Sequence, residues 1–266
     1  MSALETIVAR RRDRVLAEFG HLTQADREDL ARGGRVVRDF AAAIGDRSDV
    51  AVIAEVKKAS PSAGPIAPAC DASAQALAYE AGGAAAVSVL TEPDFFGGSY
   101  DDLADVAGAV GLPVLAKDFV VDPVQIHVAR GRGADAVLLM VSVLGHLTRD
   151  FARIAVTLGM TPLVEIASEE ELAIALGVRA GVIAVNARDF RTLKVDPVAQ
   201  RELLADARRY GVTIVAASGV ACRADVERAA AAGAGTVLVG ELLMRASDPR
   251  SALGELTGVP RVQPAV

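Results

Sequence analysis

The sequence contains no tryptophan, and its aromatic residues make up only 4% of the chain. It therefore offers no aromatic platform on which nucleic acid bases could stack. Basic residues are not in excess, because 28 lysines and arginines face 34 aspartates and glutamates and give a net charge of −6. The two signs are interspersed along the chain, so the sequence predicts no broad basic surface for nucleic acid.

Cysteine and long hydrophobic runs are scarce as well. Only Cys70 and Cys222 occur, far apart and without a metal-ligand motif, which argues against a disulfide framework and against a zinc site. Hydrophobic residues reach 52% and the mean hydropathy is +0.35, yet no uncharged apolar stretch is long enough to span a membrane. The first residues place arginines after apolar residues, which is not the order of a signal peptide. We expect a cytoplasmic protein.

What the chain does contain is a long alternation of apolar and amphipathic segments. Eight short apolar segments have the character of buried strands, at 50 to 56, 84 to 90, 113 to 117, 136 to 141, 161 to 166, 182 to 186, 213 to 218 and 236 to 240. Helical segments lie between them, such as 71 to 81, 99 to 109, 123 to 130 and 197 to 210. Most begin near Asp, Ser, Thr or Pro and end near Gly, as helices do.

Apolar strands that alternate with helices predict a parallel sheet covered on its faces. Eight such units favour a closed (β/α)8 barrel of the TIM type. The alternative is a doubly wound open sheet, which ordinarily shows a glycine-rich motif after its first strand, whereas lysines and prolines follow here. We predict one α/β domain over residues 1–266, with residues 1–48 as an N-terminal helical extension. That extension is expected to hold an amphipathic surface helix at 3 to 18 and another helix at 25 to 45.

The first predicted strand ends in the run VAVIAEVKKASPSAGP, which brings Glu55, Lys57 and Ser60 together. Side chains two residues apart on a strand point to the same face, so Glu55 and Lys57 should project together beyond the strand end. A charged strand end that merely reaches solvent is the plainer alternative. This solvent-exposed interpretation is weakened if other strands also end in charged residues.

Other strand ends repeat the pattern. Lys117 lies between Leu115 and Phe119, and Glu165 lies within LVEIAS, while the sixth strand is followed by polar residues. The candidates on these later strands are Lys117, Glu165, Asn186 and Arg188. Each charge alone could be a structural ion pair, but charges on four strand ends point to an active site at the C-terminal face of the barrel.

The last two strand ends carry a second signal, Ser218-Gly219 and Gly240-Glu241. Glycine lets a backbone approach a ligand closely, and a short helix that begins at Gly240 would direct free amides at an anion. Phosphate sites commonly follow strands seven and eight of such barrels. The pattern predicts a phosphorylated ligand.

The segments IAEVKKASPSAGPI, AVSVLTEPDFFGGS, PVLAKDFVVDP, LVEIAS, VNARDFRTL and LVGELLM resemble the signature blocks of the indole-3-glycerol-phosphate synthase family of tryptophan biosynthesis. The resemblance extends over nearly the whole chain. It implies a carbon-carbon lyase that converts 1-(2-carboxyphenylamino)-1-deoxyribulose 5-phosphate into indole glycerol phosphate, carbon dioxide and water. It also implies no cofactor and no metal, no membrane or nucleic acid partner, and a monomer or weak homo-oligomer.

The resemblance further implies a role for each candidate residue. Lys117 matches the general acid, Glu165 its partner acid or base, and Glu55 the carboxylate associated with late proton removal. The positions that match substrate-binding residues are Lys57, Ser60, Asn186, Arg188 and Ser218, and those that match the phosphate site are Gly219, Gly240 and Glu241.

One departure from the family pattern concerns catalysis. Family members typically have Glu before the Ser-Gly of the seventh strand, where this chain has Ala217; Ala184 and Ala187 are smaller departures. The missing carboxylate suggests a weakened synthase, but a paralogue with an altered substrate is an alternative. A Schiff-base barrel lyase, which also uses a buried lysine, and a non-catalytic phosphate-binding barrel are the others.

Overall fold

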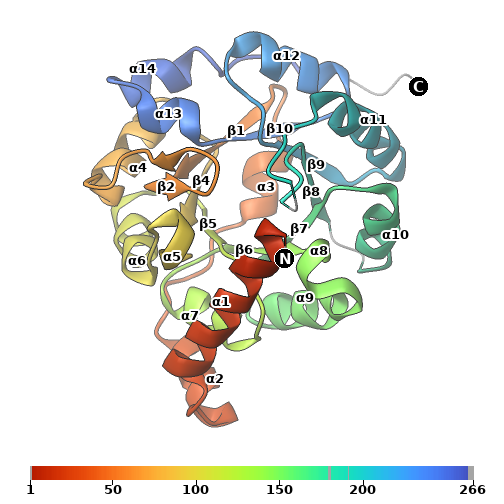
Figure 1. Ribbon diagram of the computed structural model, residues 1–266. Coiled ribbons are helices and arrows are strands. Elements are labelled where there is room, and N and C mark those ends of the chain that lie inside the picture. The colour runs from red at the N-terminus through yellow and green to blue at the C-terminus, as the bar shows by residue number, and fades with distance from the viewer. Residues whose placement is uncertain (1, 179–180, 191, 263–266) are drawn as a thin grey trace.

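The computed structural model describes residues 2–178, 181–190 and 192–262. Eight parallel strands form a closed barrel in the order β1-β10-β9-β8-β7-β6-β5-β4, with a ring of helices around it (Figure 1). The strands are β1 Ala51–Val56, β4 Ala86–Leu90, β5 Val114–Lys117, β6 Ala136–Met140, β7 Thr161–Ile166, β8 Val182–Asn186, β9 Thr213–Ala217 and β10 Thr236–Val239. Each coincides with a predicted strand to within about two residues. The closed barrel is confirmed, and the doubly wound open sheet is wrong.

Helices connect the strands and cover the barrel. They are α4 Ala72–Ala81, α5 Pro93–Phe96, α6 Tyr100–Ala109, α7 Val124–Gly131, α8 Val141–Leu144, α9 Thr148–Thr157, α10 Glu169–Val178, α11 Pro197–Ala207, α12 Arg223–Ala231, α13 Glu241–Arg245 and α14 Pro249–Gly254, with 3-10 turns η1 Gly145–Leu147 and η2 Arg208–Tyr210. Side chains of Asp71, Ser99 and Asp196 accept N-terminal backbone N–H groups of α4, α6 and α11. These caps are the reason that each helix begins where the sequence predicts.

Three helices precede the barrel: α1 Ala3–Phe19, α2 Gln24–Arg32 and α3 Phe40–Gly45. The single helix predicted at 25 to 45 is therefore wrong, because the chain leaves the helical path after Arg32. Gly33 ends α2, and a Cβ at Gly34 would collide with Arg130 of α7. The close approach to α7 breaks the helix that the sequence pattern suggests.

The helical extension contacts both ends of the barrel. On α3, Phe40 and Ile44 are fully buried beneath the strand starts, and the Ile44 carbonyl accepts a hydrogen bond from Thr236 of β10. Helix α1 instead crosses the opposite end, with its N-terminus near the centre of the ring in Figure 1. Leu4 and Ile7 of α1 are buried in the same apolar cluster as the barrel interior. The amphipathic surface helix predicted at 3 to 18 is thus confirmed, with one face buried and the other exposed.

Alternation along the strands decides which side chains enter the barrel. On β1, Ala51 and Ile53 belong to the interior cluster, and Glu55, two residues further on, points to the same side. The residues between them face the helices. The same alternation directs polar or small residues of four further strands into the barrel at the C-terminal ends of the strands, which we call the uppermost interior layer. These are Lys117 of β5, Glu165 of β7, Asn186 of β8 and Ala217 of β9.

A short hairpin, β2 Ala59–Ser60 and β3 Gly64–Pro65, folds within the loop after β1. None of the described helices combines the length and the apolar character that crossing a bilayer requires. The division into a barrel domain and an extension over residues 1–48 stays a prediction, and its outer limits, residues 1 and 266, lie outside the described residues.

Candidate active site

A cavity of about 540 Å³ opens at the C-terminal ends of the strands. All of the site residues predicted from the sequence line it: Glu55, Lys57, Ser60, Lys117, Glu165, Asn186, Arg188, Ser218, Gly219, Gly240 and Glu241. They come from strands far apart in sequence, and barrel closure is what brings them to one opening. The arrangement shows that the residues meet, while their individual roles stay predictions.

Two lysines share one buried carboxylate at the centre of this cavity. The Glu55 side chain is only 3% exposed, and its two oxygens lie 3.1 Å from Lys57 Nζ and 3.2 Å from Lys117 Nζ. A Cβ at Gly240 would meet Glu55 Oε1 and crowd Lys57 Nζ, so glycine at this position makes room for the pair. The spacing of Glu55 and Lys57 in the sequence thus produces a direct ion pair.

The electrostatics of the cluster separate the two glutamates. Burial disfavours charge on Glu55, but Lys117 and Lys57 outweigh burial and lower the pKa of Glu55 to about 2. Burial likewise opposes charge on Lys117, yet Glu55 and Glu165 raise the pKa of Lys117 above its ordinary value. Burial raises the pKa of Glu165, against the opposing effects of Lys117 and Asn186. One carboxylate is therefore held charged, while the other keeps its proton to a higher pH than usual.

Glu165 is also incompletely paired. Its Oε2 atom is buried and has no hydrogen-bond partner among the described residues. Asn186, 8% exposed, hydrogen bonds to the Glu165 side chain and accepts the backbone N–H of Arg188 at 2.9 Å. A buried polar atom without a partner is unusual in a folded protein, and at the wall of a cavity it offers a bond to a ligand.

Loops on two sides of the cavity meet through Arg188. Its Nη1 donates to Ser62 Oγ at 3.0 Å and to the Leu193 carbonyl at 3.2 Å. Ser60, in the same loop as Ser62, is 7% exposed and accepts the backbone N–H of Ala63 at 3.2 Å. Arg188 therefore adds a guanidinium to the two ammonium groups, and the opening carries positive charge suited to an anion.

The two predicted phosphate-binding segments lie on the same wall. Ser218 and Gly219 have positive φ angles of 67° and 81°. Gly240 precedes α13, and the Glu241 carboxylate pairs with Arg245 at 3.0 Å, while both residues line the cavity. A carboxylate repels an anion. A contribution of Glu241 to anion binding can therefore come from its backbone and not from its side chain.

Ala217, where the family resemblance leads one to expect glutamate, is 3% exposed and lines the cavity. It lies beside Asn186 in the register of β8 and β9. The missing carboxylate thus falls in the uppermost interior layer, among the candidate catalytic groups.

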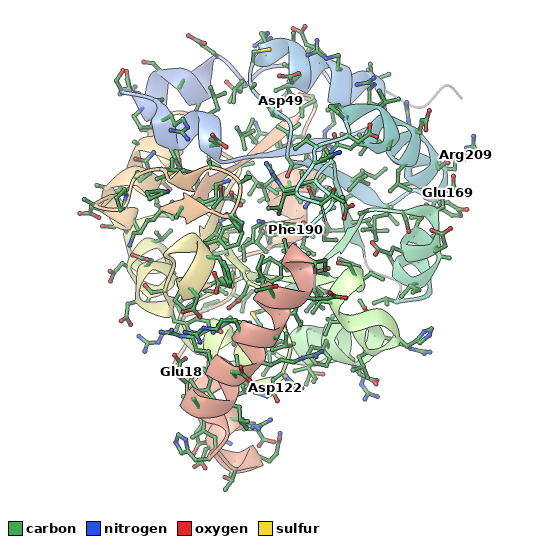
Figure 2. All side chains as sticks on the ribbon, viewed as in Figure 1. Glu18, Asp49, Asp122, Glu169, Phe190 and Arg209 are labelled. Carbon is green, nitrogen blue, oxygen red and sulfur yellow. The ribbon has the colours of Figure 1, made fainter. Side chains whose placement is uncertain are left out.

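Sequence reasoning missed an aromatic wall. Phe119 contacts Phe96 and Phe190, with ring centroids 5.9 Å and 5.4 Å apart. Phe190 lies beside the N-terminal end of α1 in Figure 2, and Leu4 of that helix lines a small cavity with it. Each of these phenylalanines follows a strand end in the segments PDFF, KDF and ARDF, so their recurrence was the available signal. The wall gives the polar site an apolar side on which an aromatic ring could pack.

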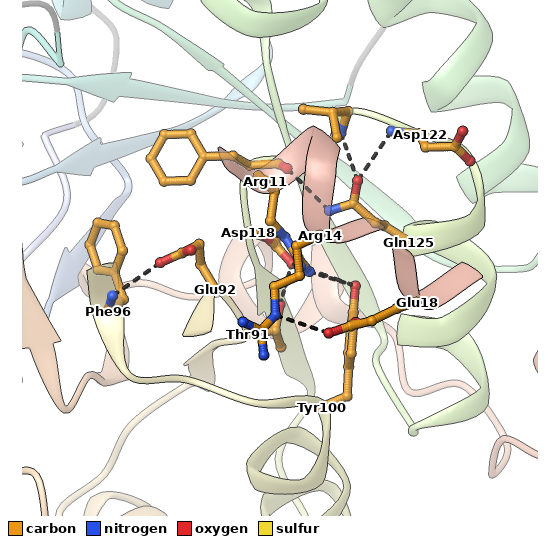
Figure 3. Close-up of polar contacts among 12 residues, drawn as sticks. Arg11, Arg14, Glu18, Thr91, Glu92, Phe96, Tyr100, Asp118, Asp122 and Gln125 are labelled. Carbon is orange, nitrogen blue, oxygen red and sulfur yellow. Dashed lines mark hydrogen bonds and ion pairs between the residues drawn. The ribbon is translucent and has the colours of Figure 1, made fainter. Parts of the chain in front are cut away.

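A second missed feature is the ion pair between Arg11 of α1 and Asp118 (Figure 3). Arg11 Nε and Nη2 donate to the two Asp118 oxygens at 2.8 Å and 2.6 Å, and both side chains are almost fully buried. Thr91 Oγ1 donates to the same carboxylate at 2.9 Å. Nothing in the local sequence of α1 points to a partner more than a hundred residues away, so only the fold identifies this pair.

Comparison with known proteins gives one family. The sequence model described as "Indole-3-glycerol phosphate synthase" matches residues 4–256. The protein of that name from Mycolicibacterium vanbaalenii is 44% identical over 256 residues, which cover 96% of this chain and 93% of that protein. Its counterpart from Micrococcus luteus is 45% identical over 258 residues, covering 95% and 96%.

Solved structures resemble this chain at the level of the fold. A 3-hexulose-6-phosphate synthase aligns with a TM-score of 0.62 and 21% identity, over 78% of this chain and 98% of that chain. A ligand-free tryptophan synthase mutant from M. tuberculosis aligns with a TM-score of 0.61 and 14% identity, over 83% and 98%. At these identities the two structures support the barrel fold alone.

Proposed function

Because the chain belongs to the indole-3-glycerol phosphate synthase family, we propose that its cavity closes the indole ring of 1-(2-carboxyphenylamino)-1-deoxyribulose 5-phosphate. The reaction releases carbon dioxide and water and makes the protein a carboxy-lyase. The observation that carries this assignment is Lys117, a lysine whose side chain is 13% exposed and is kept charged by Glu55 at the wall of a cavity that also holds Glu165.

Ring closure needs an electrophilic carbonyl carbon, because the attacking ring carbon is a weak nucleophile. A charged lysine near the carbonyl oxygen both polarises the bond and supplies the proton as the new carbon-carbon bond forms. The raised pKa of Lys117 supports this role of general acid. The cationic ring that results accepts the electron pair of the carboxylate as carbon dioxide leaves.

Loss of water completes the indole ring. The hydroxyl formed from the carbonyl leaves with a second proton, and the neighbouring carbon gives up a proton as the double bond forms. Glu165, whose pKa is raised and whose Oε2 has no partner, is suited to exchange protons with substrate or with Lys117. Late proton removal by Glu55 stays a prediction, and its pKa of about 2 makes it a weak base in the ligand-free protein.

Charge and shape support a substrate with two anionic groups and one aromatic ring. Lys57, Arg188 and Asn186 would hold the carboxylate end, together with Ser60, while the phosphate would meet the backbone at Gly219 and Gly240. Phe96 and Phe190 line the cavity, are packed against Phe119 and provide an apolar surface for the ring. We propose a cytoplasmic enzyme that acts on this small molecule without a nucleic acid or membrane partner.

The Schiff-base lyase is the second candidate, favoured only by the burial of Lys117. A Schiff base requires a neutral amine as nucleophile, whereas Glu55 and Glu165 raise the pKa of this lysine. We therefore rank it below the synthase.

Purified protein incubated with the proposed substrate should develop indole fluorescence and release one carbon dioxide per indole formed. Borohydride added during turnover should leave Lys117 unmodified in the mass spectrum. A covalent adduct on Lys117 would favour the Schiff-base lyase, and substrate binding without turnover would favour the non-catalytic barrel.

A further inference from the structure

Gln200 of α11 links two strand ends from behind the active-site cavity. The residue is 9% exposed, and its Nε2 atom donates to the carbonyl of Val185 at 2.9 Å and to that of Ala217 at 2.8 Å. These carbonyls belong to the residues that immediately precede Asn186 and Ser218. One amide group therefore uses both of its N–H donors at the ends of β8 and β9.

The Ala217 carbonyl is held by two donors, because the backbone N–H of Ala187 also reaches it, at 3.0 Å. In a planar trans peptide the C=O and the N–H point in opposite directions. Since the carbonyl of Ala217 points toward Gln200, the N–H of Ser218 in the same peptide points away from Gln200. Gln200 does not line the active-site cavity. It lines a separate cavity of about 30 Å³ together with Ser218 and Gly219.

The turn itself needs such support. Ser218 has φ of 67°, one of two positive values among the described non-glycine residues, and Gly219 follows with 81°. A side-chain-bearing residue in the left-handed region is strained and keeps that conformation only when its surroundings fix it. Within the described chain, the N–H groups of Ser218 and Gly219 donate to no other backbone or side-chain group. They are free for a ligand in the cavity that both residues line.

We propose that Gln200 is a positioning residue for phosphate binding: by anchoring the Ala217 carbonyl it sets the Ser218-Gly219 turn so that its N–H groups face the phosphate. The assignment rests on the proposed function, which places the substrate phosphate at this turn. Gln200 touches no substrate. It acts through the peptide that joins Ala217 to Ser218.

The test replaces Gln200 with methionine, which has nearly the same length and shape but no donor. We expect Gln200→Met to raise KM and the inhibition constant of inorganic phosphate about tenfold, the size expected when hydrogen bonds to a buried carbonyl are lost. The turnover number should change less than about twofold, because an interaction that serves binding alone leaves kcat unaltered. If the methionine variant fails to fold, Gln200→Asn replaces it in the test. Asparagine is too short to reach both carbonyls, so this variant should also raise KM and the inhibition constant of phosphate.

Gln125 offers a matched control. It is also buried, donates to the Phe119 carbonyl at 3.1 Å and accepts two backbone N–H groups, but at the end of β5. Gln125→Met should reduce stability without altering the inhibition constant of phosphate. A purely structural role for Gln200 predicts that the two variants behave alike, and that result would overturn the proposal.

A double-mutant cycle with Ser218→Gly tests the route of action. Glycine adopts a positive φ without strain, so the turn in this background depends less on Gln200. The effect of Gln200→Met on phosphate inhibition should therefore shrink to about threefold or less. Additive effects would contradict the proposal. If wild-type turnover proceeds but inorganic phosphate does not compete, the phosphate site and the role of Gln200 both fail while the synthase assignment stands.

Discussion

Lys117 and Asp118 are neighbours in sequence and both form ion pairs, but they serve opposite sides of the barrel wall. Lys117 points inward and meets Glu55 at 3.2 Å at the edge of the cavity. Asp118 meets Arg11 of the N-terminal helix α1, away from the principal cavity (Figure 3). One strand end thus supports both a candidate catalytic group and the attachment of α1.

The two ion pairs differ in how completely their atoms are satisfied. Asp118 accepts hydrogen bonds from Nε and Nη2 of Arg11, from Thr91 and from the Tyr100 hydroxyl, so both of its oxygens have partners. The inner cluster instead keeps a buried Glu165 oxygen without a partner and borders open space. Because its atoms already have partners, the outer pair of Arg11 and Asp118 serves the fold. The inner cluster keeps an atom that can still hydrogen bond to a substrate.

We expect the largest effect from breaking the inner ion pair, that of Lys117 with Glu55. Lys117→Met should lower kcat by at least about a hundredfold, the range for a lost general acid. The fold should survive, because Glu55 keeps Lys57 as a partner at 3.1 Å. Indole fluorescence measures the rate and circular dichroism the fold. A variant that retains more than about a tenth of the activity would remove Lys117 from the mechanism.

Lys58 provides the matched control for this change. It forms an ion pair with Asp102 at 2.7 Å but does not line the cavity. Lys58→Met should therefore leave the turnover number within a few-fold of wild type. An equal loss in both variants would mean that the rate responds to lost lysines in general.

Breaking the outer pair should cost stability more than rate. Arg11→Met leaves the Asp118 carboxylate buried without its cation, and we expect the free energy of unfolding to fall by about 3–5 kcal/mol. Denaturant titration measures the loss, with turnover compared at a temperature where both proteins are folded. Arg10 is 64% exposed and 3.7 Å from Asp94, so Arg10→Met should change stability little. A loss of turnover as large as that of Lys117→Met would give Arg11 a catalytic role.

A third change completes the inner cluster. Ala217→Glu adds a carboxylate to the uppermost interior layer, where it should help keep Lys117 charged. We expect kcat to rise up to about tenfold with little change in KM, if the wild type is a weakened synthase. Both constants come from the fluorescence assay. A wild type that is already fast and a variant that gains nothing would show the position to be dispensable.

The smallest effect concerns the pH dependence of stability. Because the pKa of Glu165 is raised from 4.5, the native state keeps a proton that the unfolded state releases, and stability falls as pH rises from about 4.5 through the raised pKa. Glu165→Gln lacks this fall, so its stability relative to wild type should increase across that window and then level off. Denaturant titrations at several pH values measure it. Glu169 is exposed on α10 (Figure 2), so the stability of Glu169→Gln should depend on pH as that of wild type does. A difference in stability between Glu165→Gln and wild type that stays constant with pH would contradict the raised pKa of Glu165.

Much of the barrel and of the site could be predicted because both depend on local patterns. Apolar runs bounded by caps gave the strands, and period-2 alternation predicted that Glu55 and Lys57 would project together. Barrel closure then required the strand ends to meet at one opening. The family resemblance assigned roles to the residues there, beyond what the pattern alone indicates.

The rest depended on contacts that no local pattern encodes. The break between α2 and α3 follows from the approach of Gly34 to Arg130, and the burial of Arg11 on α1 follows from its pairing with Asp118. The role proposed for Gln200 depends on two carbonyls from different strands. Each is a long-range pairing, so a helix or a glutamine looks ordinary in sequence until the fold supplies its partner.

The charge on Lys117 is the central claim, and NMR titration of its Nζ atom in protein with 15N-labelled lysine tests it most directly. The signal is identified by its absence from Lys117→Met. We expect a pKa of Lys117 above the ordinary 10.5 in the wild type, and a lower pKa in Glu55→Gln, where the loss of the carboxylate leaves burial less opposed. A wild-type pKa below 10.5 that Glu55→Gln leaves unchanged would contradict this effect of Glu55 on Lys117. A pKa below the pH of the assay would indicate the neutral amine that a Schiff-base enzyme requires.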